Sequence, residues 1–200
     1  MKTNLKRVLL FSFLLLSPLT HGSTVLRLGY SYNDISSNAF SDYNTDVSGS
    51  SFQVGLAERV SLIEYGLLYT KGSYNGSLKH DDSNQEFKGT YSRISLDSKV
   101  FFNKHLFLQL GYGFTSAKFN MVSSLSEYQQ NSIYSLYNLK SEEKSGAFYY
   151  GIGLDVFETK KFNISFLLGR NKIDNHKTDT SAMLGLKMSF DLGSKNFLSP

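Results

Sequence analysis

Residues 105–118, HLFLQLGYGFTSAK, carry the clearest structural signal in the chain. Because side chains alternate between the two faces of a β-strand, this segment has one apolar face and one face of glycine and polar residues. The apolar face consists of Leu106, Leu108, Leu110, Tyr112 and Phe114. A strand face in water gains nothing from the glycines at positions 111 and 113, since glycine weakens a strand. The pattern therefore favours a strand whose apolar face meets lipid and whose glycine face lines a narrow barrel.

Seven further segments repeat this alternation, at residues 26–32, 51–57, 63–69, 91–97, 148–156, 162–169 and 181–190. Their glycines share the face opposite the apolar stripe, as do those of the first segment: Gly29, Gly55, Gly66, Gly111, Gly113, Gly151, Gly153, Gly169 and Gly185. An eight-stranded barrel is just wide enough inside for side chains to fill it, so glycines there make room for Arg27, Tyr91, Arg93 or Tyr149. The sequence predicts an all-β protein, an eight-stranded antiparallel up-and-down transmembrane β-barrel.

The predicted connections alternate in length. Residues 34–48, 71–88, 119–144 and 171–179 form long connections, whereas residues 58–61, 98–104 and 157–161 form short ones. Short periplasmic turns and long extracellular loops are typical of outer-membrane barrels. No stretch after residue 22 is apolar for long enough to form a transmembrane helix, and a spanning chain without one must close into a barrel.

The first 22 residues have the features of a secretory signal peptide. Lys2, Lys6 and Arg7 precede a mainly apolar run at 8–16, and Gly22 is small enough for the cleavage site. The expected organisation is a signal peptide at 1–22, a barrel at 23–192 and a short periplasmic tail at 193–200. Removing the signal leaves 18 basic residues from the total of 21, against 17 acidic ones, so the charge indicates no nucleic-acid partner. The chain has no cysteine, which excludes disulfides and a lipid-modified N-terminus.

Two segments carry a resemblance to a known family. The hairpin YYGIGLDVFETKKFNISFLLGR at 149–170 and the closing strand SAMLGLKMSF at 181–190 resemble the small bacterial outer-membrane barrels, namely the OmpA transmembrane domain and the OmpX/Ail group. Gly185, Met188 and Phe190 resemble the barrel-assembly signal of such proteins. Phe190 is not the last residue, and the ten residues that follow are too few for a peptidoglycan-binding domain. The resemblance implies a monomer in the outer membrane of a Gram-negative bacterium, with the assembly machinery, membrane lipid and lipopolysaccharide as partners.

Six ionisable residues share the inward face of the predicted strands: Arg27, Arg93, Lys187, Glu64, Asp97 and Asp155. Three cations and three carboxylates in a tight lumen are explained most simply as a compensating plug, because an unpaired buried charge is costly. We expect Glu64 within ion-pair reach of Arg27, Arg93 or Lys187. Arg27 and Lys187 should lie at similar height, with Glu64 or Asp97 as counter-charges. The functional alternative is a proton or ion path, or a gated pore.

No residue is expected to be catalytic, to hold a cofactor or to bind a metal. His80, with the neighbouring Asp81, Asp82 and Ser83, has the residue types of a triad but not its geometry, His105 lies at a short turn, and His176 lacks recurring metal-ligand spacing. The connection 119–144 contains apolar and aromatic residues, which fit either a binding surface or strands that continue beyond the membrane. The expected function is a non-enzymatic envelope protein whose long extracellular loops serve surface interaction or envelope integrity; the OmpX/Ail resemblance implies adhesion or serum resistance through contacts with host or surface ligands. The alternatives are a narrow OmpW-like channel and a lipid A-modifying enzyme.

Overall fold

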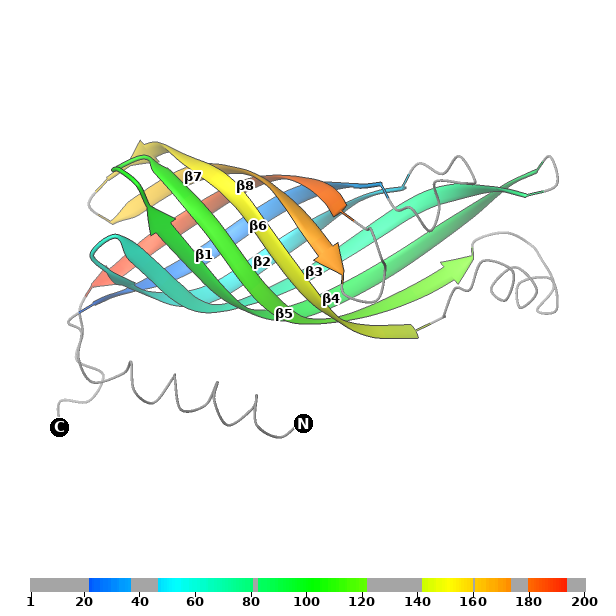
Figure 1. Ribbon diagram of the computed structural model, residues 1–200, viewed down its shortest axis with the longest axis horizontal. Coiled ribbons are helices and arrows are strands. Elements are labelled where there is room, and N and C mark those ends of the chain that lie inside the picture. The colour runs from blue at the N-terminus through cyan, green and yellow to red at the C-terminus, as the bar shows by residue number, and fades with distance from the viewer. Residues whose placement is uncertain are drawn as a thin grey trace.

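A computed structural model of the chain describes residues 22–36, 47–80, 83–121, 142–159, 161–173 and 180–193. The described secondary structure is entirely β: β1 (Ser23–Ser36), β2 (Val47–Val60), β3 (Ile63–His80), β4 (Ser83–Phe101), β5 (Leu106–Met121), β6 (Glu142–Glu158), β7 (Phe162–Ile173) and β8 (Thr180–Gly193). Each strand pairs antiparallel with the next, and β8 pairs with β1, so the sheet closes into a barrel (Figure 1). This confirms the predicted eight-stranded up-and-down barrel.

Burial follows the predicted alternation on every strand. On β5, Gln109 is 1% exposed and Phe114, on the opposite face, is 73% exposed. The outward side chains form an apolar belt around the barrel, to which all eight strands contribute, with Tyr30, Phe52, Leu67, Ile94, Phe114, Ile152, Leu168 and Leu184 as exposed examples. A continuous belt of this kind is too large for a protein surface in water, so the exterior suits lipid. Among the described residues, no helix is long and apolar enough to cross a membrane.

Four inward aromatic rings lie over glycines on the neighbouring strand. In each pair the two residues are register partners, and a Cβ on the glycine would collide with the ring: Tyr149 over Gly111, Phe107 over Gly153, Tyr91 over Gly72, and Tyr74 over Gly89. The prediction that inward glycines make room for Tyr91 and Tyr149 is confirmed. For Arg27 and Arg93 it stays a prediction, since none of their atoms is among the three nearest to a Cβ at any described glycine.

The prediction of a long loop at 71–88 is wrong. β3 continues to His80 and β4 begins at Ser83, with these two residues paired. The pairing of β2 with β3 ends at Gly76, and that of β4 with β5 ends at Phe87, so the tip of the hairpin projects beyond its neighbours (Figure 1). This stretch lies beyond the belt and lacks an apolar outward face, so its sequence does not show the alternation of the other strands.

The three predicted short turns are confirmed and lie at the end of the barrel where β1 begins and β8 ends (Figure 1). Ser61 turns the β2–β3 connection with φ 54°, in the left-handed region. At the β4–β5 turn, Asn103 Oδ1 accepts the backbone N–H groups of His105 and Leu106, both at 2.8 Å. The predicted signal peptide apart from Gly22, most of the connection 119–144 and the tail beyond Gly193 lie outside the described residues.

Candidate functional site

The candidate site is the polar interior of the barrel. The six charged residues predicted to face inward are all buried, and none is more than 5% exposed. They come from β1, β3, β4, β6 and β8, so the interior brings together residues that are far apart in the sequence.

Arg27 is the centre of this interior network. Its Nε donates to Glu64 Oε1 and its Nη1 donates to Asp97 Oδ1. The side chain thus spans from β1 to carboxylates on β3 and β4, which are not its neighbours in the sheet. A guanidinium suits this role because its fixed fork of donors serves two carboxylates at once.

Glu64 is shared between three cations. Arg59 donates from Nε to Glu64 Oε2 at 2.9 Å, with Arg59 Nη2 2.7 Å from the same oxygen. The Lys99 ammonium lies 3.8 Å from Glu64 Oε1. The register explains the cluster, because Glu64 is paired with Arg59 on β2 and with Lys99 on β4. Sequence reasoning missed Arg59 and Lys99, which it assigned to turns, although both have the parity of the inward face.

Asp97 is held by two further donors. Its Oδ2 accepts from Gln109 Nε2 and from the Tyr149 hydroxyl. Gln109 Oε1 in turn accepts from Lys187 Nζ at 2.7 Å. Lys187 is therefore joined to Asp97 through an amide, and within the described part of the chain no carboxylate lies within ion-pair distance of it. The expectation that Glu64 lies within ion-pair reach of Arg27, Arg93 or Lys187 is confirmed through Arg27, and both Glu64 and Asp97 are counter-charges of Arg27, but neither pairs directly with Lys187.

The remaining two predicted residues, Arg93 and Asp155, make other contacts. The Arg93 guanidinium is 5.2 Å from the centre of the Tyr149 ring, a cation–π distance. Asp155 Oδ2 accepts from Asn163 Nδ2 at 3.0 Å. In the β1–β8 register Arg27 faces Ser189 and Lys187 faces Gly29, so the two cations are offset by two residues.

The interior charge is unequal, contrary to the prediction of three against three. Buried cations in the described strands are Arg27, Arg93, Lys99 and Lys187, and buried carboxylates are Glu64, Asp97 and Asp155. Lys99 is the difference. Its ammonium is fully buried, has no hydrogen-bond partner and lies 4.7 Å from the Phe107 ring.

Apolar side chains fill the interior beside the charges. Phe101, Phe107, Leu167 and Met183 form a buried cluster, and the Phe101 and Phe107 ring centres are 5.5 Å apart. The Arg59 guanidinium lies 5.0 Å from the Phe101 ring. Sequence reasoning overlooked Phe107, although its parity placed it on the inward face.

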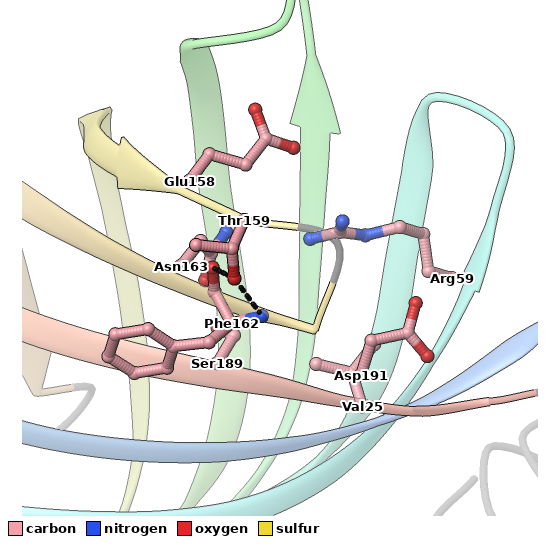
Figure 2. A pocket seen from close by; sticks show the side chains of 8 residues that line it. All are labelled: Val25, Arg59, Glu158, Thr159, Phe162, Asn163, Ser189 and Asp191. Atoms are coloured by element: carbon pink, nitrogen blue, oxygen red, sulfur yellow. Dashed lines mark hydrogen bonds between the residues drawn. The ribbon is translucent and has the colours of Figure 1, made fainter.

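A cavity of about 110 Å³ lies at the turn end of the barrel (Figure 2). Figure 2 shows Arg59 reaching from β2 toward the β6–β7 connection, where Thr159 and Phe162 are hydrogen-bonded. Asn163 Oδ1 and Ser189 Oγ are buried without a partner, and both residues line this cavity. Water bound there would satisfy them. No group of three or more metal-ligating residues occurs in the described ranges.

The residues of the predicted barrel-assembly signal lie on both faces of β8. On β8, Gly185 is buried inside, whereas Met188 and Phe190 face outward. The Phe190 ring centre is 4.9 Å from that of Phe162, and the strand continues past Phe190 to Gly193. His105 is exposed at the β4–β5 turn, while the His80 side chain and His176 lie outside the described residues.

No protein-family model matches the chain, and no curated protein matches it. Solved structures do. Neisserial surface protein A (NspA) is 13% identical, with 84% of this chain and 97% of that chain covered, at a TM-score of 0.52. Ail of Yersinia pestis is 14% identical over 84% and 97% of the two chains, at a TM-score of 0.46. The N-terminal barrel of Pseudomonas aeruginosa OprF is 16% identical over 86% and 99%, at a TM-score of 0.43. By its closed ring of antiparallel strands, its apolar exterior and its likeness to the first of these structures, the chain has the fold of the small eight-stranded outer-membrane β-barrels.

Proposed function

We propose that this protein is a non-enzymatic barrel of a bacterial outer membrane, exported by a signal peptide at residues 1–22, with a closed interior and an extracellular end that makes surface contacts. The apolar belt supports a membrane location, since exposed apolar side chains of this number favour lipid. The barrel-assembly machinery would act on the closing strand through Gly185, Met188 and Phe190, and the protein would reside in the membrane as a monomer.

The packing of the interior is the observation that carries this proposal. Arg27 is linked to Glu64 and Asp97 across the barrel, and the Phe101–Phe107 pair fills the space beside them. The side chains of Glu64 and Lys99 are 0% exposed. An interior packed in this way acts as a plug that stabilises the barrel. The surface contacts are therefore expected at the ends of the strands.

Among the described residues, the β3–β4 hairpin is the main feature of the proposed extracellular end. Its outward side chains are exposed and polar, among them Lys71, Ser73, Asn75, Glu86 and Lys88. The Tyr74 and Tyr91 rings pack over glycines on the partner strand and stiffen it. A rigid polar ribbon loses little conformational entropy on binding, which suits contact with a host or cell-surface ligand.

The test is to shorten the hairpin. Replacing residues 77–86 with Asn-Gly retains the pairing of β3 with β2 and of β4 with β5, and provides a type I′ turn. The variant should fractionate with outer membranes and keep the different gel mobilities of unheated and heated barrels. Cells that express it should lose host-cell adhesion or serum survival to the level of a deletion strain. Adhesion and survival equal to wild type would contradict the role of the hairpin.

A narrow channel is the second candidate. It is favoured by buried polar atoms without partners, including Thr70 Oγ1, Thr115 Oγ1 and Ser165 Oγ, which would be satisfied by water inside the barrel. Single-channel recording separates the two candidates, because a water path that spans the barrel conducts ions. Mass spectrometry of lipid A from a deletion strain tests the remaining alternative, a lipid A-modifying enzyme, which predicts an altered lipid mass.

A further inference from the structure

The described strand pairs show two register shifts, and both lie beside the cavity at the turn end of the barrel. β6 carries one extra residue between Asp155 and Phe157, which makes Glu158 the register partner of Asn163. β8 shifts against β1 immediately beyond Asp191. Glu158, Asn163 and Asp191 all line the cavity (Figure 2). Because β-bulges re-aim side chains and are frequent next to binding sites, the two shifts direct attention to this cavity.

Two buried oxygens of the cavity wall, Asn163 Oδ1 and Ser189 Oγ, have no hydrogen-bond partner among the described residues. The two residues are register partners on β7 and β8, and they are 5% and 3% exposed. Asn163 Nδ2 donates to Asp155 Oδ2 at 3.0 Å, so the amide is held in one orientation and its oxygen is the atom left over. A buried polar atom without a partner costs free energy, and these two oxygens are therefore expected to contact a bound group.

The donors of the cavity wall are engaged elsewhere. The Thr159 hydroxyl donates to the backbone oxygen of Phe162 at 3.0 Å and accepts from its backbone nitrogen at 3.1 Å. Arg59 reaches from β2 toward the cavity (Figure 2), and its Nε donates to Glu64 Oε2 at 2.9 Å, with Nη2 2.7 Å from the same oxygen. The wall therefore offers a bound group mainly oxygen acceptors.

The charge of the wall favours a cation. Glu158 and Asp191 contribute two carboxylates, and the charge of Arg59, the cationic side chain of the described wall, is compensated by Glu64. Hard cations bind carboxylate, amide, hydroxyl and water oxygens, and Ca²⁺ accepts irregular arrangements of about six to eight of them. Mg²⁺ requires a nearly ideal octahedron and gives up water reluctantly. The cavity of about 110 Å³ has room for an ion together with bound water.

We propose that the turn-end cavity binds a partly hydrated Ca²⁺ ion through Asn163 Oδ1 and Ser189 Oγ. Glu158 and Asp191 supply negative charge through bound water, and Asp155 is a positioning residue that holds the Asn163 amide. The site differs from the expectation, drawn from the sequence, that no residue binds a metal. An amide and a hydroxyl are its direct ligands, so it is unlike a cluster of acidic residues or histidines, of which the described ranges contain none. The ion links β6, β7 and β8 at the end of the barrel where β8 pairs with β1.

The test is calorimetric titration of the protein with CaCl₂ and with MgCl₂, in a nonionic detergent free of anionic lipid and at constant NaCl. Wild type should bind Ca²⁺ with a Kd of about 10⁻⁴–10⁻³ M, the range of extracellular calcium modules, and Mg²⁺ about tenfold more weakly. Ser189→Ala removes a direct ligand, and Glu158→Gln removes a charge at an exposed position. Each substitution should weaken Ca²⁺ binding about fivefold, since affinity depends on the number and charge of the ligands.

Ser95→Ala and Glu86→Gln are the matched controls. Ser95, like Ser189, is a buried inward serine, and Glu86, like Glu158, is an exposed glutamate, but neither lines the cavity. Both controls should bind Ca²⁺ as wild type does. No Ca²⁺ binding by wild type would mean that water alone occupies the cavity, and would overturn the site. Wild-type affinity in Ser189→Ala and Glu158→Gln, equal losses in the controls, or equal binding of Mg²⁺ would each overturn it as well.

Discussion

Arg27 and Glu64 form a buried ion pair between strands that are not neighbours in the barrel. Arg27 also reaches Asp97, and Glu64 also receives Arg59, so each partner of the pair connects to a second group. The pair therefore links β1, β2, β3 and β4 across the interior. Removing Glu64 takes away the carboxylate that Arg27, Arg59 and Lys99 share, and removing Arg27 takes away the ion-pair partner of Asp97.

Glu64→Gln should destabilise the barrel strongly. The change leaves Arg27, Arg59 and Lys99 around a neutral amide, and breaking a buried pair by removing one partner costs about 3–5 kcal/mol. Urea unfolding in detergent or lipid measures the loss. Glu86→Gln, which neutralises an exposed glutamate of the same chain, is the control and should change the free energy of unfolding little. Equal effects of the two substitutions would contradict the network.

Lys99→Met, in contrast, should not destabilise the barrel. The Lys99 ammonium has no hydrogen-bond partner, lies 3.8 Å from Glu64, and is the cation in excess of the predicted balance. Glu64 keeps Arg27 and Arg59 when Lys99 is removed, and an apolar residue of similar volume commonly replaces a buried charge without loss. We expect unchanged or increased stability in the same urea assay. A loss as large as that of Arg27→Met would show that Lys99 is needed for charge balance.

Gly111→Ala should destabilise the barrel by displacing the Tyr149 ring. A Cβ at this position would collide with that ring, whose hydroxyl donates to Asp97. Overpacking of this kind costs about 1–3 kcal/mol. Gly185→Ala is the matched control, because the nearest atoms to its Cβ are 3.6 Å away, an ordinary contact. Both variants are compared by equilibrium unfolding after refolding in vitro; a larger loss for Gly185→Ala would contradict the packing described.

The cost of an arginine on the outer face of β5 should depend on whether its position lies within the apolar belt or beyond it. Leu110→Arg places a charge in the apolar belt and should cost about 2–4 kcal/mol in lipid vesicles. Ser116→Arg, six residues further on the same face and beyond the belt, should cost little. The free energy of unfolding in vesicles measures both. Identical costs at the two positions would mean that the belt does not end between them.

The sequence predicted the barrel and the orientation of its side chains because both depend on local alternation. A belt in lipid requires apolar residues at every second position, and that requirement is visible in β5 and β6 without knowledge of the partner strands. The hairpin tip between Gly76 and Phe87 was missed because no lipid constrains it. Arg59 and Lys99 were missed because their role follows from cross-strand register with Glu64, which alternation within one strand does not determine.

Current through the wild-type protein in planar bilayers measures whether the interior is closed. If the Arg27–Glu64–Asp97 network and the Phe101–Phe107 pair close it, wild type shows little steady conductance. Glu64→Gln should then leak, with a preference for anions, because cations dominate the interior of that variant. A large and steady wild-type conductance would contradict the closed interior and favour the channel.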